Sequence, residues 1–435
     1  MHPHLPAGLV LALTLAGPLC ARAEPDYALH AQATVTWQGH PAFRSPYAGA
    51  LSLDSGARGD ETADVTLYAG LRPWAGGEIW IDPEIDQGFG LSNTVGVAGF
   101  PSGEAYKVGA SEPYLKLPRL FLRQTVDLGG ETGKAEADLN VLGGPRTADR
   151  LVVTIGKFSV ADVFDANAYA HDPRQDFMNW SLIDTGTFDY AADAWGYSLG
   201  AAAEWYRGPW TLRAGLFDLS TVPNSASPDW TFSQMQAVWE VERRYELGGR
   251  AGKAAITGFV SRGRMARFAD AVALARRTGL PPEVSAVRDY RTRTGVSFNL
   301  EQALSDHLGL FVRAGEADGS LETYEFADID QTVAAGLSQD GTPWKRPDDK
   351  AGAAVVVNQI SSAHQAYQAA GGTGILIGDG KLPHAGPEAI VEAYYNLQVV
   401  PGVRLGADYQ FVSNPAYNRD RGAVSVLGLR LHLQQ

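Results

Sequence analysis

The chain has 435 residues, a formal net charge of −13, 49 glycines and one cysteine, and 10% of its residues are aromatic. An acidic chain repels nucleic acid, which excludes nucleic-acid binding as the main function. Beyond the N-terminus no apolar run approaches the length of about 18 residues that a membrane-spanning helix needs, which excludes a helical membrane protein.

The N-terminus is typical of a secretory signal peptide. An apolar run over residues 8–17 is followed by A-R-A at residues 21–23, a pattern that precedes cleavage. We therefore expect a signal peptide at residues 1–23 and a single mature domain at residues 24–435. Cys20 lies within the signal, so the mature chain can form no disulfide.

The pattern of a membrane strand is clearest over residues 195–205. Odd positions are apolar with an aromatic residue near each end (Trp195, Tyr197, Leu199, Ala201, Ala203 and Trp205), and even positions are small or polar. Alternate side chains of a strand point to opposite faces, and ten tilted residues at about 3.3 Å each climb roughly 25 Å. After a short turn at residues 207–208 the alternation resumes. This stretch predicts a hairpin with its apolar face toward lipid.

Sixteen segments show strand patterns of this kind. They begin near Leu29, Asp64, Gly76, Arg119, Arg150, Asp193, Pro209, Phe232, Gly252, Tyr290, His307, Ile329, Lys350, Pro387, Gly402 and Arg421. One such strand would also fit an ordinary β-sandwich. Their number, and polar faces rich in glycine, serine, threonine and charges, favour a barrel. Since lipid does not tolerate open sheet edges, the sheet must close. The predicted fold is all-β, a transmembrane antiparallel β-barrel of 16 strands.

The connections alternate between short and long, as expected for periplasmic turns and outer loops. Short connections occur at residues 72–75, 207–208 and 400–402, and long ones at residues 39–63, 84–118, 159–192, 263–289 and 361–386. Residues 129–149 and 339–349 are long for periplasmic turns, and the sequence offers no reason for the first. Helical patterns at residues 264–277 and 361–370 predict short helices in outer loops.

The third outer loop, which follows the fifth strand, is dense in aromatic, acidic, amide and arginine side chains. Long loops of this kind are usually functional, and we expect this one to fold into the lumen. Aromatic side chains offer flat apolar faces, and arginine, amide and carboxylate side chains offer directional hydrogen-bond donors and acceptors. Candidate constriction residues of the loop are Asp162, Asp165, Asn167, Tyr169, Asp172, Arg174 and Trp180, and those of the wall are Arg123, Glu204, Arg213, Arg313, Glu392 and Arg404.

An alternative role is open for many of these residues. The loop aspartates can tie the loop to the wall through salt bridges, and the wall arginines can pair with carboxylates and keep the lumen rigid. The two roles are compatible. A pore for phosphate would be predominantly basic, whereas the mixed charges of this lumen suit neutral polyols.

Two passages of the third loop resemble the carbohydrate-selective outer-membrane porins of the OprB type. They read D-V-F-D-A-N-A-Y-A-H-D-P-R at residues 162–174 and N-W-S-L-I-D-T-G-T-F-D-Y at residues 179–190. F-R-S-P-Y-A-G-A-L-S-L, R-P-D-D-K-A-G and P-E-A-I-V-E-A-Y-Y-N also fit, so the resemblance covers nearly the whole mature chain. It implies a 16-stranded porin in the bacterial outer membrane that passes monosaccharides such as glucose passively. One departure is the C-terminus, which is Gln435 rather than an aromatic residue.

The expected partners are carbohydrate solutes, outer-membrane lipid and lipopolysaccharide. The sequence leaves open whether the protein is a monomer or a homotrimer, and whether the pore is a general diffusion porin without a sugar site. No nucleophile elbow or catalytic histidine arrangement is present, so an enzyme is not expected. Asp82, Glu84 and Asp86 are spaced like calcium ligands but lack the other residues of a calcium loop, so no metal or cofactor is expected.

Overall fold

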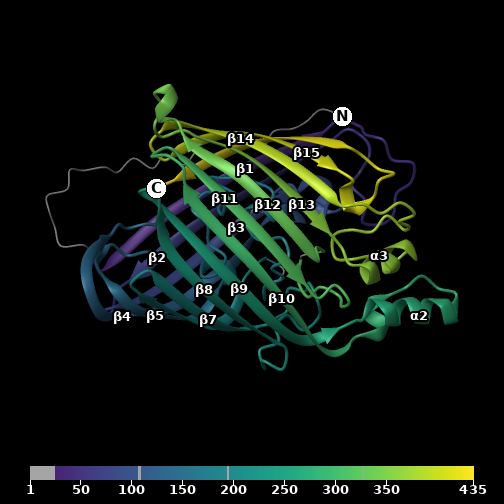
Figure 1. Ribbon diagram of the computed structural model, residues 1–435, viewed down its shortest axis with the longest axis horizontal. Coiled ribbons are helices and arrows are strands. Elements are labelled where there is room, and N and C mark those ends of the chain that lie inside the picture. Colours follow the sequence, from purple (N-terminus) through teal and green to yellow (C-terminus); the bar gives the residue numbers. More distant parts are fainter. Residues whose placement is uncertain (1–24, 106–108, 194, 327) are drawn as a thin grey trace.

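The sixteen predicted strands form a closed antiparallel barrel in the structure, a computed structural model that describes residues 25–105, 109–193, 195–326 and 328–435 (Figure 1). Each strand pairs with the next along the chain, and the last pairs with the first, where Thr34 lies opposite His432. The predicted fold class and the count of sixteen strands are therefore confirmed. The predicted signal peptide at residues 1–23 lies outside the described residues.

The strands are β1 (Tyr27–His40), β2 (Arg58–Leu71), β3 (Gly77–Phe89), β4 (Gly109–Ala135), β5 (Gly144–Phe158), β6 (Ser198–Arg207), β7 (Trp210–Asp218), β8 (Met235–Leu247), β9 (Arg250–Met265), β10 (Asp289–Ala303), β11 (Leu308–Ala317), β12 (Gln331–Asp340), β13 (Lys350–Gln359), β14 (Glu388–Val400), β15 (Val403–Ser413) and β16 (Val424–Gln434).

The helices are α1 (Trp180–Ile183), α2 (Phe268–Thr278) and α3 (Ser362–Ala369), with single 3-10 turns η1 (Leu91–Thr94), η2 (Val160–Asp162), η3 (Val284–Val287), η4 (Thr342–Trp344) and η5 (Pro415–Tyr417). Within the described part of the chain, none of the helices is both long and apolar enough to span a membrane. The two predicted outer-loop helices are present as α2 and α3. They lie together beyond one end of the barrel (Figure 1), and Phe268 stacks on His364 with ring centroids 4.3 Å apart.

The outward face of the barrel is apolar and the inward face is polar, because strand side chains alternate between the two. Outward residues such as Val35, Leu67 and Ile155 are 41–53% exposed, whereas inward Thr66 and Gln410 are fully buried. Exposing so many large apolar side chains to water would be unfavourable, so this face suits lipid.

The aromatic pair at the start of the predicted sixth strand does not face lipid. The strand begins only at Ser198, and the indole Nε1 of Trp195 donates to the Tyr114 hydroxyl at 3.1 Å. The ring of Tyr197 lies under the Arg119 guanidinium at 5.0 Å. Trp205, at the other end, does face outward. The apolar–polar alternation of the sequence begins before the first residue of the strand, so the pattern overestimated the length of the strand.

The prediction of a long turn at residues 129–149 is wrong. β4 continues to Ala135 and β5 begins at Gly144, so the connection is residues 136–143. Gly129 and Gly130 adopt positive φ angles of 100° and 83° at shifts in the strand register, so they bend the strand instead of ending it. The resulting hairpin curls beyond the end of the barrel that carries the short turns (Figure 1).

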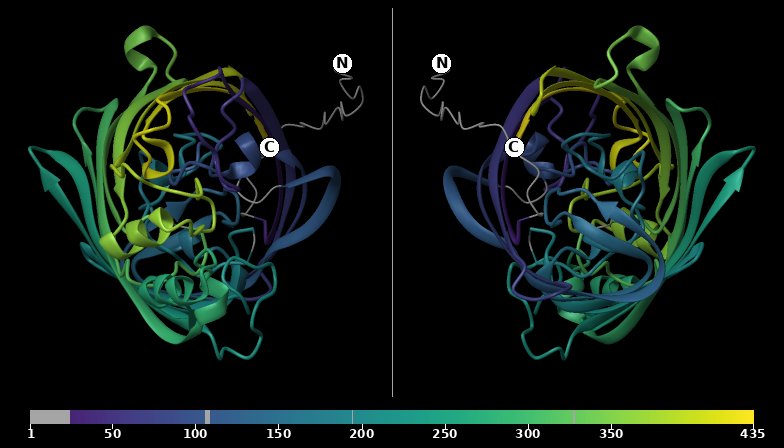
Figure 2. Two further views of the ribbon diagram at one scale, coloured as in Figure 1. Left: turned by 90° about the vertical axis from the view of Figure 1, so that its right-hand side faces the viewer. Right: turned by 90° about the vertical axis from the view of Figure 1, so that its left-hand side faces the viewer.

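The lumen is occupied by loop segments rather than being an open channel (Figure 2). Phe164, Phe177, Trp180 and Phe188 of the third loop are almost completely buried and belong to the main hydrophobic cluster of the protein. This barrel therefore has its apolar core inside the ring of strands, on a loop packed against the wall.

Candidate functional site

The third loop (residues 159–197, between β5 and β6) is held inside the barrel by wall side chains. Arg313 on β11 donates to the backbone oxygens of Ala170 at 2.8 Å and Asp165 at 3.0 Å. Glu392 on β14 accepts hydrogen bonds from the backbone N–H groups of Met178 and Asn179. Each contact compensates a polar backbone group that would be unpaired inside the barrel, so the loop has one defined position.

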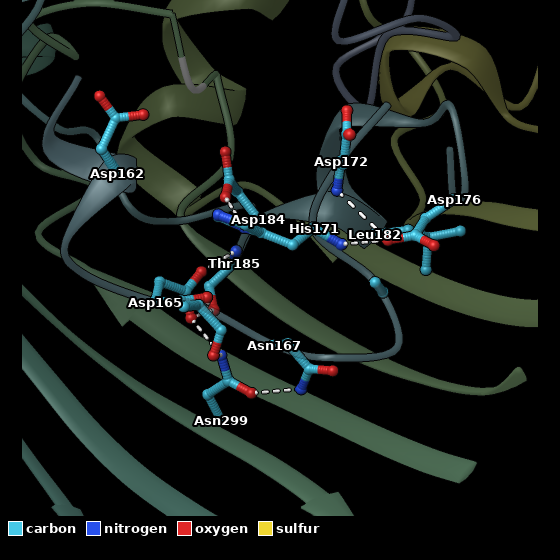
Figure 3. Close-up of polar contacts among 12 residues, drawn as sticks. Asp162, Asp165, Asn167, His171, Asp172, Asp176, Leu182, Asp184, Thr185 and Asn299 are labelled. Atoms are coloured by element: carbon cyan, nitrogen blue, oxygen red, sulfur yellow. Dashed lines mark hydrogen bonds and ion pairs between the residues drawn. The ribbon is translucent and has the colours of Figure 1, made fainter. Parts of the chain in front are cut away.

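Asp165 and Asn167 form a second anchor, shown in Figure 3. The Asp165 carboxylate accepts from the Thr185 N–H at 2.6 Å and from the Asn299 side-chain amide at 2.8 Å. Asn167 donates to the Asn299 side-chain oxygen at 2.7 Å. Asp165 is fully buried and has a φ of 60°. Aspartate adopts this left-handed conformation more readily than most residues, and the hydrogen bonds from Thr185 and Asn299 hold its side chain in place.

A cavity of about 450 Å³ lies between the third loop and the wall formed by β2 to β5. Its volume is in the range of small-molecule sites. The wall contributes Tyr68, Lys116, Arg119, Phe121 and Arg123, the third loop contributes Asp162, His171, Asp172, Arg174 and Trp180, and the loop between β3 and β4 contributes Glu104. Five of the predicted residues thus line one cavity: Arg123, Asp162, Asp172, Arg174 and Trp180.

Charged groups in this cavity are arranged in opposite pairs. Arg119 binds Asp162 with two hydrogen bonds, Nε to Oδ2 at 2.8 Å and a terminal nitrogen to Oδ1 at 2.6 Å. Arg174 reaches Glu104 at 2.6 Å and Asp64 at 3.6 Å. Two-pronged guanidinium–carboxylate pairs are strong and fix both partners in orientation.

The loop carboxylates of the cavity are held in their ionised form. Burial by itself would raise the pKa of Asp162, but Arg119 and the backbone N–H of Ser159 outweigh it and lower that pKa. Burial likewise opposes ionisation of Asp172, and Arg174 with its backbone N–H lowers the pKa. Ionised carboxylates only accept hydrogen bonds, so these oxygens face the cavity as acceptors.

His171 has the opposite tendency. Burial favours the neutral ring, but the nearby Asp184 carboxylate raises the pKa of His171 above its usual value of 6.5. Its Nδ1 lies 3.5 Å from the Asp184 carboxylate, and both residues line the cavity near Asp172 (Figure 3).

Trp180 supplies the flat apolar surface of the cavity. Its ring stacks on Phe100 with centroids 5.3 Å apart and planes 10° apart, and Phe326 meets it edge-on at 4.7 Å. The indole Nε1 is buried and has no hydrogen-bond partner among the described residues. A buried donor without a partner is costly.

Eight predicted site residues do not line this cavity. Asp165, Asn167, Arg313 and Glu392 are the loop anchors described above. Arg213 forms ion pairs with Glu204 at 3.0 Å and with Glu240 and Glu242, which braces the wall of β6 to β8. Tyr169 and Arg404 line a second cavity, of about 620 Å³, among the short turns. The alternative role as structural ties thus describes the geometry of most wall residues.

Lys116 and Arg119 line the cavity but escaped prediction. The two residues are three positions apart, so in a regular strand their side chains would point to opposite faces. Both point inward because an extra residue in β4 shifts the register between them. Pro83 and Pro118 flank that shift, and proline cannot donate to the strand ladder. Proline in the middle of an alternating segment was the available signal.

The wall carboxylates with calcium-like spacing are paired with lysine. Lys116 Nζ lies 3.0 Å from Glu84 and 2.9 Å from Asp86. Over the described ranges of the chain, no group of three or more histidine, cysteine, aspartate or glutamate side chains is placed to hold a metal ion.

A closed barrel with an apolar exterior and a polar lumen narrowed by an infolded loop defines a porin. The chain matches the model of the OprB family, described as carbohydrate-selective porins, over residues 52–434, and it belongs to that family. It is therefore a carbohydrate-selective porin of the outer membrane rather than an enzyme. No curated protein sequence matches the chain.

Solved structures with the same fold include the high-pH structure of Pseudomonas putida OprB, with a TM-score of 0.72, 15% sequence identity and 94% of each chain covered. The low-pH structure of the same protein has a TM-score of 0.52 and 12% identity, covering 94% of this chain and 93% of that one. The outer-membrane channel DcaP of Acinetobacter baumannii has a TM-score of 0.54 and 12% identity, with coverages of 94% and 97%.

Proposed function

We propose that the 450 Å³ cavity between the third loop and the β2–β5 wall is the sugar-selective constriction, and that its solutes are neutral monosaccharides such as glucose. The observation that carries this proposal is the combination, in one cavity, of the Trp180 ring, the Arg119–Asp162 pair and polar atoms without a partner among the described residues, which are Trp180 Nε1, Arg174 Nε and His171 Nδ1.

The chemistry of the lining suits a polyhydroxylated ring. A guanidinium has five N–H donors, and Arg119 uses two of them on Asp162, so the others can donate to hydroxyl oxygens. The carboxylates of Asp162 and Asp172 accept from hydroxyl hydrogens. The Trp180 ring can contact the C–H face of the sugar. Because the charges are paired, an ion gains little by entering, whereas a neutral polyol can use donors and acceptors together.

We further propose that the outward apolar face contacts outer-membrane lipid and lipopolysaccharide.

The oligomeric state, monomer or homotrimer, is a separate question. Light scattering of the detergent-solubilised protein measures its mass and distinguishes the two.

The proposed site is tested by single-channel recording in a planar bilayer with glucose and maltose titrations. Saturable block of the ion current by glucose, weaker for maltose, is expected. A conductance that falls only in proportion to solution viscosity would show a general diffusion pore and overturn the proposal. Arg213→Lys is the control for substitutions in the cavity, because Arg213 lies in the wall cluster outside it. This variant should leave glucose block unchanged.

A further inference from the structure

The β4–β5 turn (residues 136–143) is unusual for a turn at the periplasmic end of a barrel, because it is partly buried. Leu142 is 3% exposed and belongs to the main hydrophobic cluster, and Leu139 packs against the same cluster. Turns at this end are normally short and solvated. Here, apolar side chains fold back toward the lumen, as in a segment that has a packing partner.

The local sequence accounts for this path. The backbone groups of Asp138 and Val141 exchange hydrogen bonds of 3.1 and 3.0 Å, which makes a tight turn with two central residues. Asn140, in its second central position, has a φ of 54°, a conformation that asparagine tolerates better than most residues. The bend at Gly129 and Gly130 brings this turn back under the barrel.

Three strands of the wall hold the turn. Arg123 on β4 donates to the backbone oxygen of Asn140 at 2.7 Å, and the Asn140 side-chain amide donates to Asp82 on β3 at 3.0 Å. Arg72, at the end of β2, donates to the backbone oxygen of Gly143 at 2.9 Å. Because the backbone oxygen and the side-chain amide of Asn140 are both hydrogen-bonded to the wall, the turn is a fixed part of the lumen wall rather than a free lid.

The turn forms the periplasmic side of the cavity. Leu139, Asn140 and Val141 line the same 450 Å³ cavity as Arg119 and Trp180. We propose that the β4–β5 turn is the inner rim of the sugar pathway and limits the size and exit rate of solutes that leave toward the periplasm. This inference rests on the proposed function, because it takes that cavity as the route. Its ligand class is the same, small neutral sugars.

Cysteine chemistry tests the rim directly, since residues 24–435 contain no cysteine. Val141→Cys is labelled from the periplasmic side with a bulky methanethiosulfonate reagent. Labelling is expected to remove most of the ion conductance and of the glucose flux. Glu131→Cys is the matched control, because it lies on the same hairpin outside the cavity and is exposed. Labelling there should leave both quantities unchanged.

A second variant separates a rim from a purely structural turn. Val141→Gly widens the rim, so the ratio of maltose flux to glucose flux should rise several-fold while folding, judged by heat-modifiable gel mobility, is retained. Unchanged conductance after complete labelling of Val141→Cys, or an unchanged flux ratio in Val141→Gly, would overturn the proposal.

The two proposals fail in different ways. If the unmodified protein shows no saturable glucose block, the sugar site fails, yet the loss of ion conductance on labelling still supports the rim. If glucose block is normal and labelling at position 141 changes nothing, the site stands and the rim is refuted.

Discussion

Replacing Trp180 by phenylalanine separates the contribution of its N–H group from that of its ring. The variant keeps an aromatic face against Phe100 and Phe326 but loses the Nε1 donor, which has no protein partner among the described residues. A hydrogen bond to a neutral group contributes roughly 0.5–1.5 kcal/mol. Since about 1.4 kcal/mol corresponds to a tenfold change in affinity, the glucose concentration for half-block should rise about two- to tenfold.

Stability should respond differently from binding. In the empty pore the indole N–H is an unsatisfied buried donor, a cost of about 1–3 kcal/mol that phenylalanine removes. The smaller ring leaves a void whose cost, of similar size, opposes this gain. We therefore expect little net change in the unfolding midpoint in detergent, together with weaker glucose block. Trp239→Phe, on the lipid-facing side at 45% exposure, is the control. Equal half-block concentrations in Trp180→Phe and the parent protein would refute the role assigned to the N–H group.

Three further perturbations probe the charges around the site. Asp162→Asn leaves the Arg119 guanidinium without its counter-charge, so the reversal potential in a salt gradient should shift toward anion selectivity; an unshifted potential would argue against an exposed guanidinium. Glu392→Leu leaves two buried N–H groups without an acceptor, at a cost of about 1–3 kcal/mol each. The third loop should then move more and increase the current noise. An unchanged noise level would contradict the anchoring role of Glu392. The raised pKa of His171 means that its ion pair with Asp184 is complete below pH 6.5 and is lost as pH rises through that raised value. Hydrogen exchange of residues 171–184, corrected for intrinsic rates, should therefore become faster at high pH, and His171→Gln should remove this dependence.

The strands were predictable because one physical rule, apolar outward and polar inward, recurs along the whole chain. The rule failed where a strand departs from strict alternation. The register shift in β4 turns Lys116 and Arg119 to the same side, and parity alone cannot assign both to the lumen. The predicted connection begins at Gly129, yet in the structure Gly129 and Gly130 bend a continuous strand.

Five of the thirteen predicted site residues line one cavity, but the separate roles of the predicted residues could not be read from the sequence. Asp165 and Asp162 look alike in the sequence, since both are loop aspartates among aromatic residues. In the structure, Asp165 is fully enclosed by hydrogen bonds from Thr185 and Asn299, whereas Asp162 lies at the cavity with Arg119. Which partner a side chain meets depends on contacts with residues 20 to 134 positions away, and one sequence holds no record of those contacts.

The interior explains why selectivity and rigidity occur together in this barrel. A loop packed on phenylalanine side chains and anchored by Arg313 and Glu392 cannot move aside for each solute, so the cavity has a defined shape. Within that shape the Arg119–Asp162 pair cancels its own net charge while keeping directional donors and acceptors. An inorganic ion gains little energy at such a surface, because it loses its hydration shell on contact. A ring of hydroxyl groups, which both donate and accept hydrogen bonds, matches the surface. Under the function proposed for this cavity, discrimination would arise from the placement of hydrogen bonds rather than from electrostatic attraction, and binding would have to be weak enough for the solute to leave.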